Sequence, residues 1–429
     1  MFSLNNEFPS IILDIGSEST KAGIGGEDAP HFVFSSYYGQ DLTKNEYYVG
    51  DKVLNPRLNL EILKMKANGS IGNWESVMEI LDHLFKDKLQ VDASDYPILL
   101  SETYGTEQGT RSKFAEILFE KFQIPALYFA HDAVLSLFAL GKSSGLVVDL
   151  GSTTRVVPVH EGYILRSGIG TSQMGSILIE DLYRHLLHTR GTPNLEHKYF
   201  SKNQNKNYNT NTSNQMNLNG GFQYRKSHNQ FFDHLIYKDM KESLSNVVQD
   251  KDIIIELIQN GSNSSNYVDL NYELPNKMLL ADLQLDSSLI VETWFSENNY
   301  LNKNGLNVSH LNPNFSSNNI VPIQDLVAHS INNSLTDIKQ SLSECILFTG
   351  GGALTKGIIP RAEKEIQNKM FKNSNCKVIQ FENSIETRFS SWIGGSILSS
   401  LTFFQHLWIS KKQYQENGPQ IVEEKFLKK

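Results

Sequence analysis

The sequence contains two matching four-residue turns. Asp14-Ile-Gly-Ser17 and Asp149-Leu-Gly-Ser152 share the pattern Asp-x-Gly-Ser and lie 135 residues apart. Each follows a short apolar run typical of a β-strand, and each precedes a second strand-like segment. One such turn is ordinary turn chemistry, because Asp, Gly and Ser all favour tight turns. Two turns in the same strand context indicate a duplicated unit, with one hairpin in each copy.

The first turn has the side chains that bind phosphate. Gly16 allows close approach to the backbone, Ser17 offers a hydroxyl and Lys21 offers a positive charge. Glu18 is at odds with this reading, because its carboxylate would stand beside the phosphates unless it points away from them. The pair of hairpins predicts a cleft for a nucleoside triphosphate between two lobes.

The second turn repeats the acidic residue and the glycine of the first. Asp149 and Gly151 stand where Asp14 and Gly16 stand in the first copy. Carboxylates of this kind hold Mg²⁺, often through bound water. We therefore expect Asp14 and Asp149 to hold a hydrated Mg²⁺ ion from opposite sides of the cleft.

Length and composition narrow the class of protein. A chain of 429 residues exceeds the usual size of one hydrophobic core, so we expect two lobes. The net charge of −8 and the pI of about 5.9 argue against a nucleic-acid-binding surface along the whole chain. Two cysteines are too few for a disulfide framework or a Cys-rich zinc site. We see no signal peptide and no apolar run of about 18 residues, which predicts a soluble intracellular protein without a membrane partner.

Helix and strand patterns alternate through the first half of the chain, which predicts the α/β class. Asn73 is a candidate N-cap for a helix over 72–90 whose apolar residues share one face. We expect hairpins over 11–24 and 146–159, strands over 97–100 and 345–349, and helices over 110–122, 134–140, 233–248 and 385–404. The helix over 385–404 is expected to be the last ordered one, since residues 411–429 are polar and charged.

Three stretches are rich in asparagine and poor in residues that could be buried. They are residues 201–221, 259–266 and 297–319. Such stretches do not offset the entropy lost on ordering, so we expect mobile insertions.

Two later segments are candidates for the adenosine side of a nucleotide site. Gly350, Gly351 and Gly352 follow a strand and would let the backbone lie against a purine and present N–H groups to phosphate. A flexible connection explains three glycines equally well. Lys241 and Glu242 could bracket the ring edge and the ribose, although such a pair is usually a solvated helix face.

These segments, in this order, resemble the actin superfamily, whose two-lobed fold is shared with Hsp70-type chaperones and sugar kinases. The stretch from Arg388 to Leu398 and the stretch from Trp408 to Tyr414 are similar to the carboxyl end of actin almost residue for residue. The resemblance implies duplicated ribonuclease H-like domains around a nucleotide cleft. It implies lobe I over 1–139 plus 383–429, and lobe II over 140–382.

Other segments are more similar to a nuclear subfamily of actin-related proteins than to conventional actin. They include Ile80-Leu-Asp-His83, Gly141-Lys-Ser-Ser-Gly145 and Pro158-Val-His160. Members of that subfamily are subunits of chromatin remodelling and histone acetyltransferase complexes. The resemblance implies actin, a helical segment of a remodeller ATPase and other chromatin-complex subunits as partners, with nucleosomes or histones reached indirectly. It also implies a nuclear location, although no convincing basic localisation run is present.

The resemblance also implies ATP with Mg²⁺ as ligand. It assigns one group of residues to each part of the cleft: Asp14, Gly16, Ser17 and Lys21 to the first phosphate loop, Asp149 and Gly151 to the second, and Lys241, Glu242 and Gly350 to Gly352 to adenosine, with Asp14 and Asp149 holding the metal through water.

The chain departs from actin where actin positions the attacking water. Asp132 takes the place of a glutamine, and Val156 is matched to an assisting histidine. Ser152 and Thr153 replace an Asp and a Gly of the second loop. Phosphoryl transfer depends on positioning and electrostatics, so we expect slow or absent hydrolysis and no catalytic residues.

The chain also departs from actin before Tyr48-Val-Gly-Asp51. Actin has a long loop there that inserts into the next filament subunit, whereas this chain has only residues 39–46. Losing half of a repeated head-to-tail contact stops propagation, so we expect no homopolymer.

The favoured reading is a structural subunit that binds ATP without turning it over. Near Phe138 and the C-terminal helix we expect an apolar groove for a remodeller helix, although core packing is the better reading for most of its aromatic residues. The alternatives are a polymerising, ATP-hydrolysing cytoskeletal protein, an active ATPase or kinase of the wider fold, and an actin-related subunit of a cytoplasmic motor-adaptor complex.

Overall fold

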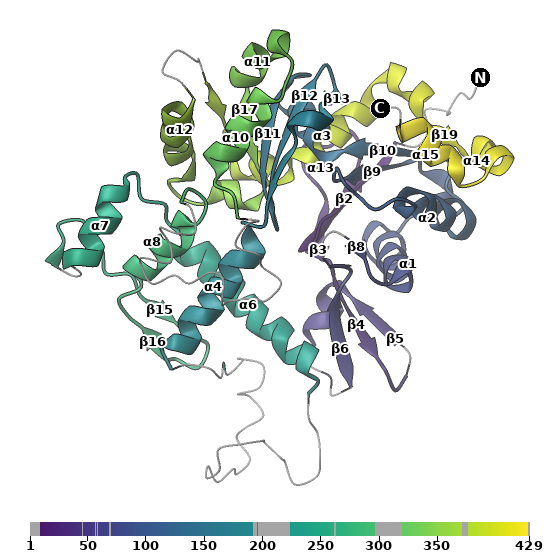
Figure 1. The fold of residues 1–429 in the computed structure, drawn as a ribbon. Helices are drawn as coiled ribbons and strands as arrows, with labels where there is room; N and C mark the ends of the chain where they lie inside the picture. Colours follow the sequence, from purple (N-terminus) through teal and green to yellow (C-terminus); the bar gives the residue numbers. More distant parts are fainter. Residues whose placement is uncertain are drawn as a thin grey trace.

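The fold consists of two sheet-centred halves with a cleft between them (Figure 1). A computed structural model describes residues 9–427, apart from 45, 56, 58, 68–69, 192–194, 196–223, 261–262, 297–319 and 371–375. The asparagine-rich stretches 201–221 and 297–319 therefore lie outside the described residues. Of the stretch 259–266 only residues 261 and 262 are not described, and Gln259 and Asn260 end a helix. Ser264, Ser265 and Asn266 all hydrogen-bond to the Glu256 carboxylate, so the described part of this stretch is ordered.

The first half is built on a mixed sheet that contains the first predicted hairpin. Its strand order among the described residues is β19-β10-β9-β1-β2-β3. Strands β1 and β9 run parallel, with Leu13 opposite Leu100, and the side chains of both strands are buried. The strands are β1 (Ile11–Ile15), β2 (Ser19–Ile24), β3 (Phe32–Ser35), β9 (Ile98–Glu102), β10 (Ala126–His131) and β19 (Ile409–Ser410).

The second half repeats this plan around the second predicted hairpin. Its sheet has the order β13-β12-β11-β17-β18, with β14 paired to β12. The hairpin strands β11 and β12 are antiparallel, and β17 runs parallel to β11, as β9 does to β1. The strands are β11 (Gly145–Leu150), β12 (Thr154–His160), β13 (Tyr163–Ile164), β14 (Gly170–Ser172), β17 (Ile346–Thr349) and β18 (Val378–Ile379).

Helices cover both sheets, and most predicted helices are confirmed. Asn73 caps α1 by accepting a hydrogen bond from the backbone N–H of Glu75, and the helix continues as a π-helical segment to Leu89. The predicted helix 233–248 is α6, which both begins and ends earlier, at Lys226 and Leu244. The helices are α1 (Trp74–Asp82), α2 (Thr110–Glu116), α3 (Asp132–Ala139), α4 (Ser176–Thr189), α6 (Lys226–Leu244), α7 (Lys251–Asn260), α8 (Gln284–Glu292), α10 (Ile323–Asn332), α11 (Thr336–Ser343), α12 (Ile358–Lys369) and α13 (Ser384–Ser400).

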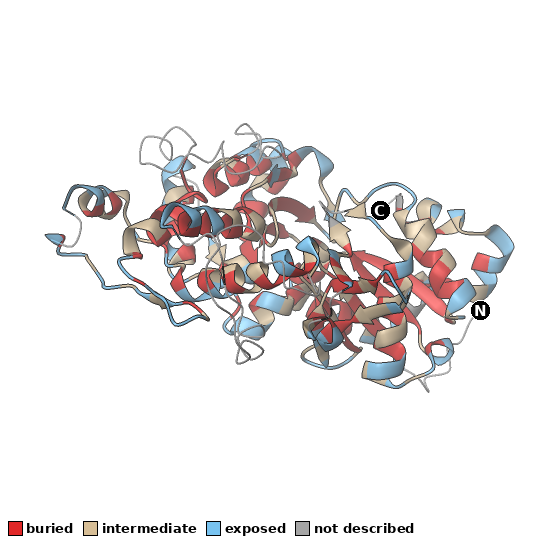
Figure 2. Cartoon of the chain, turned by 90° about the horizontal axis from the view of Figure 1, so that it is seen from below, coloured by how far each residue is buried: buried red, intermediate tan, exposed pale blue. Residues whose placement is uncertain are grey.

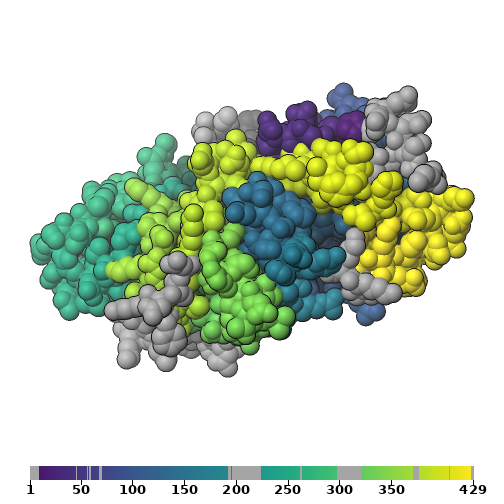
Figure 3. Space-filling view, turned by 90° about the horizontal axis from the view of Figure 1, so that it is seen from above, coloured from purple at the N-terminus to yellow at the C-terminus, as the bar shows by residue number. Residues whose placement is uncertain are grey.

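The expectation that order ends near residue 404 is wrong. A 3-10 turn over Thr402–Leu407 leads to two further helices, α14 (Lys411–Asn417) and α15 (Gln420–Leu427). Their few apolar residues, Tyr414, Val422 and Phe426, are buried against the first sheet's core. Figure 3 shows this yellow C-terminal segment beside the purple N-terminal strands. The composition of 411–429 hides the helices because only one narrow face is apolar.

The two halves are joined where α3 crosses α13. A Cβ atom added to Gly394 of α13 would lie 1.8 Å from the Leu135 carbonyl oxygen of α3, so only glycine permits this approach. Buried residues, red in Figure 2, continue through both halves. Trp392 of α13 is fully buried and donates to the Ile12 carbonyl, which fixes this helix against the first sheet.

A small three-stranded sheet, in the order β5-β4-β6, extends from the first half toward α6 of the second. Its strands are β4 (Tyr37–Asp41), β5 (Glu46–Val49) and β6 (Leu60–Lys64), and the short pair β7 (Lys66–Ala67) and β8 (Ser70–Ile71) follows. A second short pair, β15 (Tyr272–Glu273) and β16 (Leu279–Leu280), lies beyond α7.

Candidate functional site

All eleven residues assigned to the nucleotide site line one cavity of about 930 Å³ between the two halves. The cavity wall combines the β1–β2 turn, the β11–β12 turn, the start of α3, the glycine loop after β17 and part of α6. The predicted residues that it brings together are Asp14, Gly16, Ser17, Lys21, Asp149, Gly151, Lys241, Glu242, Gly350, Gly351 and Gly352.

Asp14 is held in place by three neighbouring groups. Its carboxylate accepts hydrogen bonds from the hydroxyls of Ser101 at 2.6 Å and Ser391 at 3.2 Å, and it pairs with the Lys21 ammonium at 3.1 Å. Burial by itself would raise the pKa of Asp14, but the charge of Lys21 and the Ser101 hydrogen bond outweigh it, so the pKa lies below its usual value. Asp14 is therefore a fixed carboxylate anion at the cavity.

Glu18 does not leave an unpaired charge beside the phosphates. Its carboxylate contacts the Lys64 ammonium at 2.5 Å and the His234 Nε2 atom at 2.9 Å. Burial opposes ionisation, yet the His234 hydrogen bond and the Lys64 charge lower the pKa of Glu18 to about 2. The conflict raised by the sequence is resolved because both lobes supply a cation to this carboxylate.

Asp149, in the second hairpin, is a much weaker acid than Asp14. Burial and the nearby Asp132 carboxylate raise its pKa to about 7, although Arg155 opposes this shift. A metal ion or a bound cation would favour the ionised form. Asp14 and Asp149 thus have the same place in the two hairpins, but their pKa values are shifted in opposite directions.

The glycine loop packs too closely against the second hairpin for side chains. Gly350 has φ +86°, and a Cβ there would lie 2.6 Å from the Asp149 Oδ1 atom. A Cβ at Gly352 would lie 2.7 Å from the Leu150 carbonyl, whereas Gly351 faces open space. The loop therefore forms a backbone cradle, as expected for a ligand that lies against the main chain.

Lys241 reaches the cavity but already has an anionic partner. Its ammonium lies 2.5 Å from Glu180 of α4, and both side chains are largely buried. Glu242 also lines the cavity.

The first turn of α4, which begins at Ser176, lies directly behind the second hairpin, because the Ser176 N–H donates to the Gly151 carbonyl. Backbone N–H groups at such a helix start favour anions.

Asp132 is fixed by its own surroundings. Its carboxylate accepts hydrogen bonds from the Thr103 hydroxyl at 2.9 Å and the Ala133 N–H at 2.7 Å. Burial raises its pKa, and Arg155 partly opposes this effect. These two hydrogen bonds use one lone pair on each oxygen of the carboxylate and fix its orientation.

The structure corrects one assignment on strand β12. Val156, matched from sequence to the assisting histidine of actin, is completely buried in the core of the second half. Its neighbour Arg155, paired with Asp149 in the hairpin, is the residue that lines the cavity. Successive side chains on a strand point to opposite faces, so a one-residue shift in a matched turn exchanges the two.

Sequence reasoning missed the cations that line the cavity besides Lys21 and Lys241, namely Lys66, Arg155, Lys238, Lys356 and Arg388. Lys66 of β7 lines the cavity and donates to the Ile15 carbonyl at 2.6 Å, and burial lowers its pKa. Arg155 faces Asp132 and Asp149 from β12. Residues 154–160 show no alternation of apolar and polar residues that would mark Arg155, and nothing local marks Lys66.

Among the described residues, no three His, Cys, Asp or Glu side chains are close enough together to hold a metal ion. A Mg²⁺ ion would therefore depend on phosphate oxygens and water as well as on Asp14 and Asp149.

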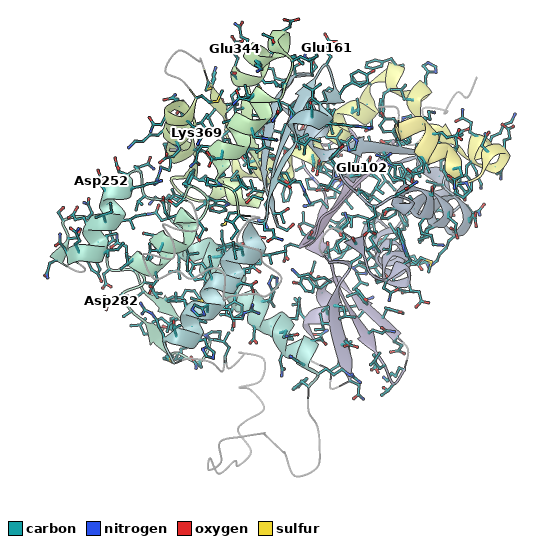
Figure 4. The ribbon with its side chains drawn as sticks, in the orientation of Figure 1. Glu102, Glu161, Asp252, Asp282, Glu344 and Lys369 are labelled. Carbon is teal, nitrogen blue, oxygen red and sulfur yellow. The ribbon has the colours of Figure 1, made fainter. Side chains whose placement is uncertain are left out.

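Side chains away from the cleft, such as Asp252, Glu344 and Lys369, lie at the periphery (Figure 4). No helix in the described part of the chain is long and apolar enough to cross a membrane.

Comparison with known proteins agrees with the cleft geometry. The sequence matches the actin family over residues 5–427. It is 29% identical to actin-related protein 4 of Arabidopsis thaliana over 98% of this chain and 99% of the relative. It is also 29% identical to actin-related protein 4 of Oryza sativa subsp. indica, over the same shares of the two chains. The resemblance noted from the sequence and the actin-like α/β fold are confirmed, and the chain belongs to the actin family.

Proposed function

We propose that this actin-related protein is a non-polymerising structural subunit of nuclear chromatin remodelling and histone acetyltransferase complexes, and that it holds ATP with Mg²⁺ as a structural ligand. One observation carries the proposal: the residues expected to meet phosphate line the cleft, whereas Asp132 and Arg155 line it at the positions that, by resemblance to actin, would orient the attacking water. Nuclear placement rests on resemblance to actin-related protein 4.

The cleft residues fit ATP and Mg²⁺. Lys21 is placed to meet phosphate, and Asp14 and Asp149 to hold hydrated metal. The Gly350–Gly352 cradle and the pair Lys241–Glu242 are placed for adenosine. The bound metal supplies charge neutralisation at the phosphates. We place lobe I over 1–139 plus 383–429 and lobe II over 140–382, so that the ligand contacts both lobes and stabilises the closed fold.

Hydrolysis is expected to be slow because Asp132 and Arg155, the cavity residues that by resemblance take the places of the water-positioning groups of actin, differ from those groups in chemistry. Asp132 is held by Thr103 and by its own helix start, and its charge adds to the negative field of a triphosphate. Positioning supplies much of the acceleration in phosphoryl transfer, so its loss leaves a binding site with little turnover.

The β4–β5 hairpin supports the absence of filaments. Asp41 pairs with Glu46, so only residues 42–45 join the two strands. The Asp41 carboxylate accepts hydrogen bonds from Thr43 and from the Lys44 N–H, which tightens the turn. This turn is too short to reach into a neighbouring subunit, as a filament contact would require.

A surface beside α3 suits a helical partner. Phe138 is half-buried on α3, and Tyr163 and Phe403 are 56% and 67% exposed, whereas Trp392 and Phe404 belong to the core. Exposed aromatic side chains at this end of the molecule are suitable anchors for an amphipathic helix. By resemblance we propose a remodeller ATPase helix as the occupant, next to an actin molecule.

Lys21→Ala is expected to remove bound nucleotide. The variant leaves the Asp14 carboxylate without its ammonium and the phosphates without a cation, so nucleotide affinity should fall by about 100-fold or more. Protein purified without added nucleotide is denatured, and released nucleotide is quantified by chromatography. Lys44→Ala in the exposed β4–β5 turn is the matched control and should retain nucleotide. Equal occupancy in Lys21→Ala and the wild type contradicts the assignment of this loop.

Affinity purification of the full chain is expected to recover actin and the subunits of a remodelling or acetyltransferase complex. Sedimentation at micromolar concentration in Mg²⁺ and ATP should leave the protein in the supernatant. Recovery of motor-adaptor subunits alone, or a polymer pellet with phosphate release at the rate of conventional actin, would overturn the proposed function.

A further inference from the structure

Five charged side chains form a continuous chain across the mouth of the cleft. Lys64 contacts Glu18 at 2.5 Å, and Glu18 contacts the His234 Nε2 atom at 2.9 Å. The His234 Nδ1 atom contacts Glu180 at 2.8 Å, and Glu180 contacts Lys241 at 2.5 Å. Lys64 and Glu18 belong to the first half, and the other three residues to the second. The Glu18–His234 contact is therefore a bond between lobes.

The geometry of His234 requires a charged ring. Each ring nitrogen lies within hydrogen-bond distance of a carboxylate, which can only accept. A neutral imidazole has one N–H and satisfies one of the two, whereas imidazolium donates to both. Burial disfavours the charge, yet Glu18 and Glu180 outweigh it, and the pKa of His234 lies above its usual value.

Every element packed against His234 contributes to this balance. The β1–β2 turn supplies Glu18, β6 supplies Lys64, and α4 supplies Glu180. On its own helix α6, Lys238 lies one turn after His234, and Lys241 is the cation that pairs with Glu180. From β4, the Tyr37 ring lies 5.3 Å from the imidazole, and burial and Glu18 raise the pKa of Tyr37, so this phenol stays neutral.

Apolar contacts and one backbone hydrogen bond accompany the ion chain. Phe231 and Phe232 of α6 are buried against Tyr37, Leu60 and Ile62 of the small sheet. The Ile62 N–H donates to the Ser227 hydroxyl of α6 at 3.3 Å. The small sheet and α6 thus meet over a continuous surface, and His234 supplies its charged link to the cavity.

We propose that His234, in its protonated form, is a positioning residue for the nucleotide cleft: it ties the two lobes together across the cleft mouth and, through Glu180, holds Lys241 at the cavity wall. Nucleotide leaves the cleft when the lobes part, so release is slow while His234 carries its proton. The nucleotide readout rests on the proposed function, whereas the tie between lobes does not.

The direction of the pH effect follows from the raised pKa. Below the usual pKa of histidine, about 6.5, the tie is fully present. It is lost as the pH rises through the higher pKa of His234 in the folded protein. Release of a fluorescent ATP analogue, chased with excess ATP and Mg²⁺, should therefore accelerate about tenfold between pH 6 and pH 9.5 along a one-proton curve.

His234→Gln is the principal test. The amide offers one donor group without charge, so at pH 6 the variant should already release the analogue at the fast rate of the high-pH wild type, without the acceleration that deprotonation of His234 causes. Glu180→Gln removes one of the two anions and should move the wild-type midpoint to lower pH. His188→Ala, at an exposed histidine of α4, should leave the curve unchanged.

Hydrogen exchange of residues 60–64 in nucleotide-free protein tests the tie without any ligand. Exchange should be faster in His234→Gln than in the wild type at pH 6, after correction for the intrinsic rate. Equal exchange, or a release rate that is as slow and as pH-dependent in His234→Gln as in the wild type, overturns the role of His234. If the wild-type protein binds no analogue, the proposal that the cleft holds nucleotide is overturned. The role of His234 in joining the lobes is still decided by the hydrogen-exchange measurement.

Discussion

Gly394→Ala is expected to lower the free energy of unfolding substantially. The new Cβ would lie 1.8 Å from the Leu135 carbonyl oxygen, and that oxygen is backbone in the middle of α3. No rotamer change relieves a clash with the main chain, so α3 and α13 must separate at their crossing. Overpacking of this kind costs about 3 kcal/mol or more in the free energy of unfolding. Urea denaturation followed by circular dichroism measures it.

The same variant should also lose nucleotide, because both crossing helices carry cleft residues. Asp132 begins α3, and Ser391 of α13 donates to Asp14. Gly72→Ala is the matched control, since a Cβ there meets nothing within 4 Å and its backbone is not in the left-handed region. An unfolding midpoint for Gly394→Ala equal to that of Gly72→Ala would show that the crossing is looser than described.

Arg361→Leu is expected to be the most damaging single replacement of a charged residue. Arg361 and Glu292 are 0% and 1% exposed in their side chains and lie 3.0 Å apart. Arg361 also donates to Glu365 and to the Val248 carbonyl, which joins α12 to α8 and to the segment after α6. Removing one partner of a buried pair leaves an uncompensated charge and costs about 3–5 kcal/mol. Thermal unfolding at pH 7.5 provides the measurement.

The loss in Arg361→Leu should shrink as the pH falls. Burial already raises the pKa of Glu292, against the opposing charge of Arg361, and removal of that cation raises it further. A group with a raised folded-state pKa is stabilised by protonation, so the variant recovers stability toward pH 5 relative to the wild type. A destabilisation that is the same at pH 5 and pH 7.5 contradicts the explanation.

Two further variants separate charge from packing. Arg361→Leu combined with Glu292→Leu removes both charges and should recover most of the lost stability, because apolar pairs often replace buried ion pairs without penalty. Lys364 lies on α12, as Arg361 does, and forms an exposed ion pair with Asp250. Lys364→Ala removes this exposed pair. It should leave the unfolding midpoint unchanged, since exposed pairs are screened by solvent.

Local sequence patterns predicted the parts of the fold that are determined by interactions between residues close together in the sequence. The two Asp-x-Gly-Ser hairpins, the Asn73 cap and the glycine loop after β17 were all found where expected, because turn, cap and close-approach chemistry involves residues a few positions apart. The helices over 411–417 and 420–427 were missed because their stability comes from packing Tyr414, Val422 and Phe426 on a distant sheet. Propensity and composition carry no information about that surface.

The cleft shows the same division. From sequence alone, the repeated turns determined that the chain has two related hairpins, since Asp, Gly and Ser favour tight turns wherever they stand, while their binding of phosphate and metal stays a prediction. Only the tertiary structure decided that Arg155 rather than Val156 faces the cleft, that Lys66 lines it, and that Glu18 is neutralised by Lys64 and His234. Strand facing and charge pairing depend on register and on which distant segments meet, and electrostatic energies depend on those distances and on burial.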